Sequence, residues 1–75
     1  MIISKDINPI RNIYYLGGRI IDILQRHDQG LLIYDAFEEM TKNVDLSMNM
    51  FILTLDWLFL IDVIIVEEGR IYKCF

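Results

Sequence analysis

An almost unbroken apolar run, FILTLDWLFLIDVIIV at residues 51–66, constrains this chain more than any other feature of its sequence. Asp56 and Asp62 interrupt the run. A stretch from residue 46 to residue 66 would be long enough to cross a bilayer as a helix. Asp56 would then lie near the bilayer centre, at a cost of about 2.5–3.5 kcal/mol, and Asp62 would add to that cost. Because the residues from Val63 onward also favour a β-hairpin, we expect no membrane span.

The chain is short and has few means of cross-linking itself. Its 75 residues have room for one domain, residues 1–75, near the lower size limit for independent folding. A single cysteine, Cys74, excludes an intrachain disulfide, and Cys74 with the single histidine, His27, cannot form a zinc site alone. We expect no cofactor. Because 55% of the residues are apolar, some must remain exposed, and large exposed apolar patches usually mark binding sites. Of the usual supports for a thin core, a partner protein is the one left.

The charge pattern argues against nucleic acid as the main ligand. The net charge is -4, and the seven Lys and Arg residues are scattered without forming a basic stripe. The N-terminal sequence MIISKDINPI lacks a basic region followed by a long apolar run, so we expect no signal peptide. The lone cysteine favours a reducing, cytoplasmic location.

The first predicted helix begins at Asn8 and Pro9, a capping residue followed by a residue whose fixed φ suits the first turn. We expect it to run to about His27, with Gly30 as its stop signal. One face at helical spacing is formed by Ile10, Ile13, Tyr14, Gly17, Ile20, Ile21 and Leu24.

Two adjacent glycines, Gly17 and Gly18, interrupt this helix at a cost of roughly 1 kcal/mol each relative to alanine. We interpret them as a place where another backbone approaches closely within the fold, with close approach of a partner protein as the alternative. A nucleotide-binding glycine loop does not fit, because no strand precedes the pair and no third glycine follows at the required spacing.

Two short elements are predicted in the middle of the chain. The apolar run LLI at 31–33 follows a glycine and favours a brief strand. Residues 34–43 favour a short helix whose Ala36, Phe37 and Met40 point inward.

The C-terminal part predicts a helix followed by a hairpin. Ser47 is a plausible cap for a third helix that runs to about Leu60 or Ile61. From Val63 onward, β-branched residues flank the turn sequence EEGR, which is typical of a β-hairpin. The order helix, short strand, helix, helix, hairpin predicts the α+β class, a small winged-helix domain with three helices, a short strand and a C-terminal β-hairpin as the wing.

The third helix is apolar on almost every side. Its predicted core face comprises Met48, Phe51, Leu55, Leu58 and Phe59, and a second group, beneath the wing, comprises Met50, Trp57 and Ile61. Asn49 and Asp56 lie almost opposite the core, with Leu53 and Leu60 within roughly 60° of that polar line. A helix that is apolar all round is a buried helix, so in so small a domain something outside the chain must cover it.

Leu53 and Leu60 allow two interpretations. They are either single exposed leucines, which need no explanation, or part of a partner-binding surface, which we favour. The candidate partner-binding residues are Asn49, Leu53, Asp56 and Leu60, together with Gly17 and Gly18. A DNA-reading helix would show polar and basic side chains to the bases, whereas residues 47–61 contain no Lys, Arg, Gln or His.

The candidate acids and bases are not organised for catalysis. Neighbouring glutamates occur at 38–39 and 67–68, and such neighbours do not face each other on a helix. His27 would suit a helix end, but no serine or threonine motif supplies an oriented nucleophile. Cys74 is read as a passive strand residue. We therefore expect no enzyme activity.

The last thirty residues carry a resemblance to a known family. The run LSMNMFILTLDWLFLIDVIIVEEGRIYKCF at residues 46–75 combines a serine-led helix, the core TLDWLFL, a hydrophobic strand and an acidic turn with glycine. It resembles the small middle components of bacterial ABC-three-component systems, and most of all the group called middle component 6. The N-terminal half, with IYYLGGRIIDIL, is similar in layout but less distinctive. The shared motif is one of packing and not of catalysis.

The resemblance implies a role in a defence complex. Such systems look like anti-phage or anti-plasmid modules that combine an SMC-like or AAA-type ABC ATPase, an effector that is often a nuclease, and small middle components. The middle component would be a non-catalytic adaptor that links ATPase and effector.

Other functions remain open from the sequence. The main alternative is a winged-helix transcriptional regulator or DNA-associated factor, as a dimer that hides the apolar face. If the chain is an adaptor, it could also form a homodimer when isolated from its partners. A small antitoxin or a phage-encoded inhibitor would share the same binding chemistry.

Overall fold

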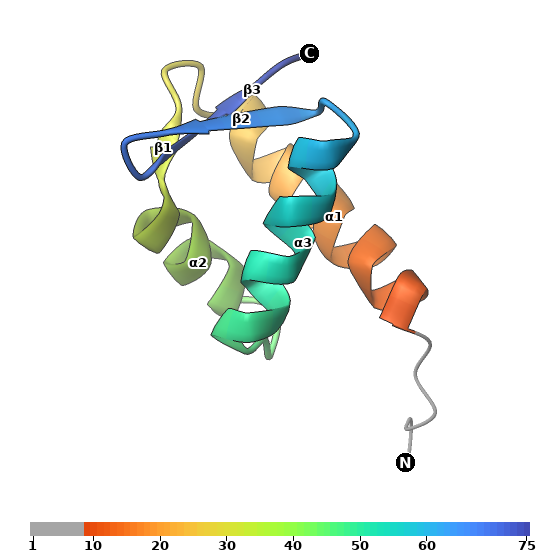
Figure 1. Cartoon of the computed structure of the whole chain (residues 1–75). Coiled ribbons are helices and arrows are strands. Elements are labelled where there is room, and N and C mark those ends of the chain that lie inside the picture. Colours follow the sequence, from red (N-terminus) through yellow and green to blue (C-terminus); the bar gives the residue numbers. More distant parts are fainter. Residues whose placement is uncertain (1–8) are drawn as a thin grey trace.

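The structure, a computed structural model, describes the backbone of residues 9–75 and the side chains from Asn12 onward (Figure 1). Its elements follow in the order α1 (Pro9–Gln25), β1 (Leu31–Leu32), α2 (Ile33–Thr41), α3 (Met48–Leu60), β2 (Ile64–Glu67) and β3 (Arg70–Lys73). The predicted α+β class and the predicted order of elements are confirmed. Asn8, the predicted cap of the first helix, lies outside the described residues.

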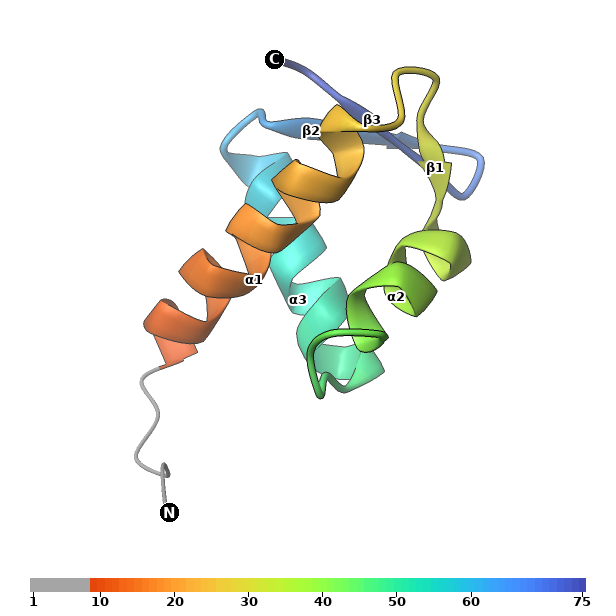
Figure 2. The same cartoon turned by 180° about the vertical axis from the view of Figure 1, so that it is seen from behind.

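The strands form one three-stranded antiparallel sheet in the order β1-β3-β2. The short strand predicted at 31–33 therefore extends the hairpin, with Leu31 opposite Ile71. Gly30 makes this pairing sterically feasible: its φ is 86°, and an added Cβ would lie 2.7 Å from Tyr72 Cδ1. The sheet lies across one end of the three helices (Figures 1 and 2).

The hairpin turn matches the prediction from EEGR. Glu68 and Gly69 both have positive φ, 53° and 76°, as a two-residue turn between twisted strands requires. The Gly69 carbonyl accepts a hydrogen bond of 2.9 Å from the Ile33 N–H. This bond fixes the start of α2 against the tip of the hairpin.

Both ends of α3 are stabilised by specific hydrogen bonds to backbone groups. Ser47 is the predicted N-cap, and its Oγ accepts a hydrogen bond of 3.1 Å from the Met50 N–H. At the other end Asp62 has φ 64°, while the Val63 N–H donates to the Leu58 carbonyl and the Asp62 N–H to the Phe59 carbonyl. This is a Schellman motif with aspartate at the position that glycine usually occupies. It turns the chain from helix into β2.

The core lies between the three helices and the inner face of the sheet. Its buried apolar side chains are Leu16, Ile20, Ile23, Leu24, Ala36, Met40, Phe51, Leu55, Leu58, Ile64 and Ile71. At its centre Phe51 is fully buried and meets Phe37 edge to face, with 5.3 Å between the ring centroids. Ala36 and Met40 are buried as predicted for the second helix. The first helix ends at Gln25, two residues before the predicted His27.

Four predicted core or near-core positions need correction. The predicted core face of the third helix includes Met48 and Phe59, but these side chains are 37% and 51% exposed. Ile61 is 48% exposed and not packed beneath the hairpin. Tyr14 was placed on the packed face of the first helix, yet it is 64% exposed. In their place the core includes Leu16, Ile23 and the fully buried Thr54, whose hydroxyl donates to the Met50 carbonyl (2.8 Å).

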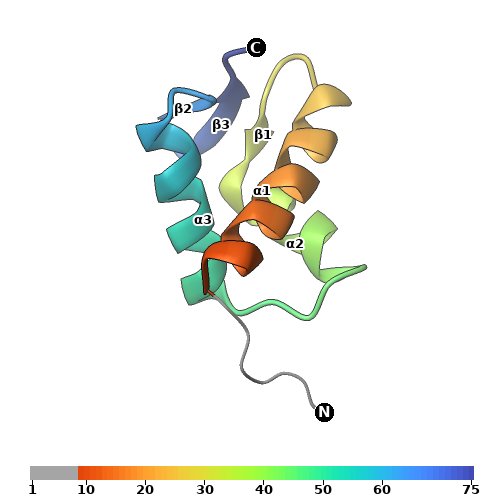
Figure 3. The same cartoon turned by 90° about the vertical axis from the view of Figure 1, so that its right-hand side faces the viewer.

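Trp57 packs against α1. Its ring meets Tyr14 edge to face, with 5.1 Å between centroids, and lies against Gly17. Figure 3 shows α1 and α3 side by side along this contact. The glycine is therefore part of the seam between the two helices.

Candidate functional site

The outward side of α3 is an exposed line of residues with two polar and two apolar members. Asn49, Leu53, Asp56 and Leu60 are all exposed, and Leu53 and Leu60 are 50% and 76% accessible to solvent. At 100° per residue the four lie within about 60° of one another, opposite the buried side of the helix. We call these four residues the outward line. The sequence predicted this line, because its two polar residues mark the solvent-exposed side of the helix.

A second exposed strip on α3 was missed from the sequence. Met48, Ile52 and Phe59 lie between the outward line and the core, on the side that faces the hairpin and the start of α2. Ile52 is 39% exposed. Since apolar side chains surround α3 almost completely, the pattern alone could not separate this strip from the core. The arrangement of β1, β2 and α2 decides which of these side chains remain exposed.

This strip forms one wall of an apolar groove. Two adjoining hollows of about 250 and 500 Å³ share Ile33 and Ile52 and together run from Phe59 and Val66 to Tyr34. We define the groove by its lining residues, Leu32, Ile33, Tyr34, Met48, Ile52, Leu55, Asp56, Phe59, Val66 and Gly69. Asp56 is the one carboxylate in this lining and also belongs to the outward line, so the groove and the outward line form a continuous surface around α3.

The two glycines of α1 occupy different environments. Gly17 is buried, and a Cβ added to it would lie 2.9 Å from Trp57 Cζ3 and 3.4 Å from Leu58 Cδ2. Gly18 is exposed and has nothing within 4 Å of such an atom. The close approach predicted within the fold is found at Gly17, although a side chain and not a backbone makes it. The structure thus places Gly17 away from the outward line, inside the seam between α1 and α3.

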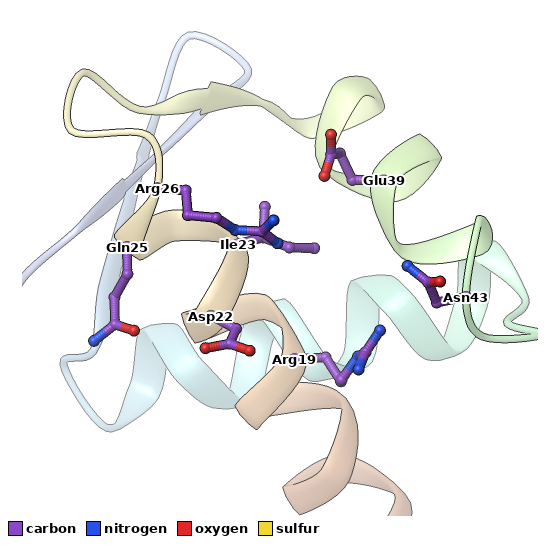
Figure 4. A pocket seen from close by; sticks show the side chains of 7 residues that line it. All are labelled: Arg19, Asp22, Ile23, Gln25, Arg26, Glu39 and Asn43. Carbon is purple, nitrogen blue, oxygen red and sulfur yellow. The ribbon is translucent and has the colours of Figure 1, made fainter.

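A polar hollow of about 520 Å³ lies between α1 and α2 (Figure 4). It is lined by Arg19, Asp22, Ile23, Gln25, Arg26, Glu39 and Asn43. Figure 4 shows Arg19 from α1 and Asn43 from the end of α2 pointing toward one another across it. The mixture of two guanidinium groups and two carboxylates, with no nucleophile beside them, defines neither an anion site nor an acid–base pair.

The described part of the chain contains no arrangement typical of catalysis or metal binding. Among residues 9–75, no group of three or more His, Cys, Asp and Glu side chains could hold a metal ion. His27 is half-buried after the end of α1, and Cys74 is exposed after β3. None of the described helices is long and apolar enough to cross a membrane.

The chain forms a small α+β domain whose third helix shows apolar side chains both outward and into a groove, as is typical of a protein-binding module. The chain belongs to the family of Middle Component 6 of ABC-three component (ABC-3C) systems, whose family model matches residues 2–74. The resemblance noted in residues 46–75 is thereby confirmed and extends over nearly the whole chain. No curated protein and no solved structure matches the chain.

Membership in this family means that the chain is a middle component, and so one part of a system with several components.

Proposed function

We propose that this chain is a non-catalytic adaptor of a bacterial ABC-three-component complex that acts in anti-phage or anti-plasmid defence. In this proposal it links an SMC-like or AAA-type ABC ATPase to an effector such as a nuclease, in the cytoplasm. Membership in the family supports the setting, and the exposed surface of α3 supports the binding role. We also propose that the fold is a winged helix, since the element order and the strand order β1-β3-β2 suit one with β2 and β3 as the wing.

The observation that carries the proposal is the outward line of α3. Leu53 and Leu60 expose 50% and 76% of their surface on the side where a helix in a soluble domain is usually polar. Moving a leucine side chain from full exposure to full burial is worth about 1.5–3 kcal/mol, and covering the exposed parts of Leu53 and Leu60 gains a fraction of that for each. Two leucines separated by two turns of one helix therefore supply an apolar centre for an interface, and Asn49 and Asp56 on the same line supply polar contacts that fix its register.

The proposal also accounts for the composition of the chain. A domain of 75 residues with a net charge of -4 gains little from exposed leucine, isoleucine and phenylalanine as a monomer. In a complex the same side chains add to a core that is otherwise thin.

Co-purification from the host system tests the proposed surface. The tagged chain is co-expressed with the proposed ATPase and effector subunits of its system, as wild type and with Leu53→Asp or Leu60→Asp. We expect both variants to fold, because these positions are exposed, and to lose the partner that wild type retains. Tyr15→Asp is the matched control, since it removes an exposed ring and adds the same charge on α1. Normal co-purification of both α3 variants would exclude this surface.

The alternative function, a DNA-associated regulator, has a separate test. Residues 47–61 supply no basic side chain, and the two basic residues of the hairpin have partners within the fold: Arg70 donates to the Gly30 carbonyl (3.4 Å) and Lys73 to Asp28 Oδ1 (3.0 Å). A titration with a DNA duplex at two salt concentrations distinguishes the two functions. A steep loss of affinity with salt would indicate phosphate contacts and favour the regulator.

A further inference from the structure

The apolar groove has an acidic border. Asp56 lines it directly from α3. Glu38 follows Tyr34 by one helical turn on the same side of α2, and Glu68 is next to the lining residue Gly69 in the hairpin turn. All three carboxylates are exposed. Asp56 is part of the lining, whereas Glu38 and Glu68 are near it through their neighbours Tyr34 in α2 and Gly69 in the hairpin.

The groove lining itself contains no Lys or Arg. Lys42 follows Glu38 by one helical turn at the end of α2. Lys73 is paired with Asp28, whereas Arg70 donates to the uncharged Gly30 carbonyl and keeps its positive charge. Arg19 and Arg26 line the polar hollow between α1 and α2 (Figure 4).

This charge pattern selects between the possible occupants of the groove. A second copy of the chain, also with a net charge of -4, would bring its own acidic border against this one, and like charges facing each other across an interface oppose association. A partner segment with Lys or Arg beside its apolar side chains would meet opposite charges at the edges and apolar surface at the centre.

We propose that the groove binds a segment of a partner subunit in which two or more apolar side chains are flanked by lysine or arginine. The apolar side chains fill the two hollows around Ile52, and the basic residues lie against Asp56, Glu38 and Glu68. This inference rests on the proposed adaptor function and adds to it the chemistry of the partner segment. It also assigns the groove a role separate from that of the outward line.

The test uses the full chain and peptides of known sequence. Overlapping fluorescent 20-residue peptides that tile the ATPase and effector subunits of the same system are titrated with the purified chain, and anisotropy reports binding. We expect the bound peptides to contain apolar residues flanked by Lys or Arg. Ile52→Asp should weaken their binding by at least about tenfold, as for a central anchor.

Charge variants separate the border from the apolar centre. Asp56→Asn, Glu38→Gln and Glu68→Gln should each weaken binding by up to about fivefold, and raising the salt concentration should reduce these differences. Glu39→Gln, one residue from Glu38 but at the polar hollow, is the matched control and should leave binding unchanged. Circular dichroism of each variant shows that the fold is retained.

Several results would overturn the inference. These are binding to none of the peptides, binding only to acidic or uncharged peptides, or border variants that bind like wild type. A dimer in sedimentation analysis that Ile52→Asp dissociates would assign the groove to a second copy. If Leu60→Asp abolishes co-purification with the partner while the groove variants do not, the adaptor proposal stands and the groove proposal fails.

Discussion

Alanine at Gly18 should stabilise the domain and alanine at Gly17 should not, although the two positions are neighbours in the same helix. Gly18 is exposed with open space around it. Replacing a glycine inside a helix with alanine removes backbone freedom from the unfolded chain, so Gly18→Ala should stabilise the domain by about 0.5–1 kcal/mol.

At Gly17 the same gain meets a steric cost. The new Cβ would lie 2.9 Å from Trp57 Cζ3, closer than carbon atoms approach without repulsion, and 3.4 Å from Leu58 Cδ2. The indole ring is rigid and packs edge to face against Tyr14 on α1, so the ring or the helix must shift to relieve the contact. Overpacking of this kind costs about 1–3 kcal/mol, which makes Gly17→Ala neutral to about 2 kcal/mol destabilising. The two variants should therefore differ by about 1–3 kcal/mol.

Urea and thermal unfolding followed by circular dichroism measure this difference. For a domain of this size, 1 kcal/mol corresponds to a change in Tm of roughly 4–8 °C. Trp57→Phe gives a second check, because a smaller ring in that place should reduce the cost of Gly17→Ala in a double-mutant cycle. Equal stabilisation by both alanine variants would refute the packing of Trp57 against α1.

Two further variants test the ends of α3. Ser47→Ala should destabilise the domain by about 1 kcal/mol in urea unfolding, because the Met50 N–H loses its acceptor. Ser47→Asp should restore the cap, and an alanine variant as stable as wild type would contradict it. Asp62→Gly should raise the free energy of unfolding by roughly 0.5–1 kcal/mol, since glycine adopts the left-handed conformation at φ 64° without strain, and a loss of stability would show that the aspartate side chain contributes to the joint.

Local signals in the sequence predicted the elements well. Ser47 as a cap, the EEGR turn and the change from helix to strand near Asp62 each depend on backbone chemistry that a few adjacent residues determine. The outward line of α3 could also be predicted, because Asn49 and Asp56 mark a polar side whatever the surroundings.

The second strip on α3 could not be predicted for a physical reason. A helical pattern gives the angle of each side chain about the axis, but only the neighbouring elements decide which angles are buried. Phe59 lies 100° from the buried Leu58 about the helix axis, at the flank of the core side, so its apolar character alone did not decide whether it is buried. The placement of β2 and α2 leaves Phe59 exposed beside the groove, while the hydroxyl of Thr54 is satisfied by the Met50 carbonyl inside the helix. The contact of Trp57 with Gly17 could not be predicted for the same reason, since Gly17 is distant in the sequence.

Assembly of the complex with and without this chain tests the central claim of an adaptor most directly. Purified ATPase and effector subunits are mixed alone, with the wild-type chain, or with Leu60→Asp, and the masses of the resulting complexes are measured by native mass spectrometry. The account predicts a complex with both subunits only in the presence of the wild-type chain, and loss of one subunit with Leu60→Asp. A complex of ATPase and effector that forms equally well without this chain would contradict it.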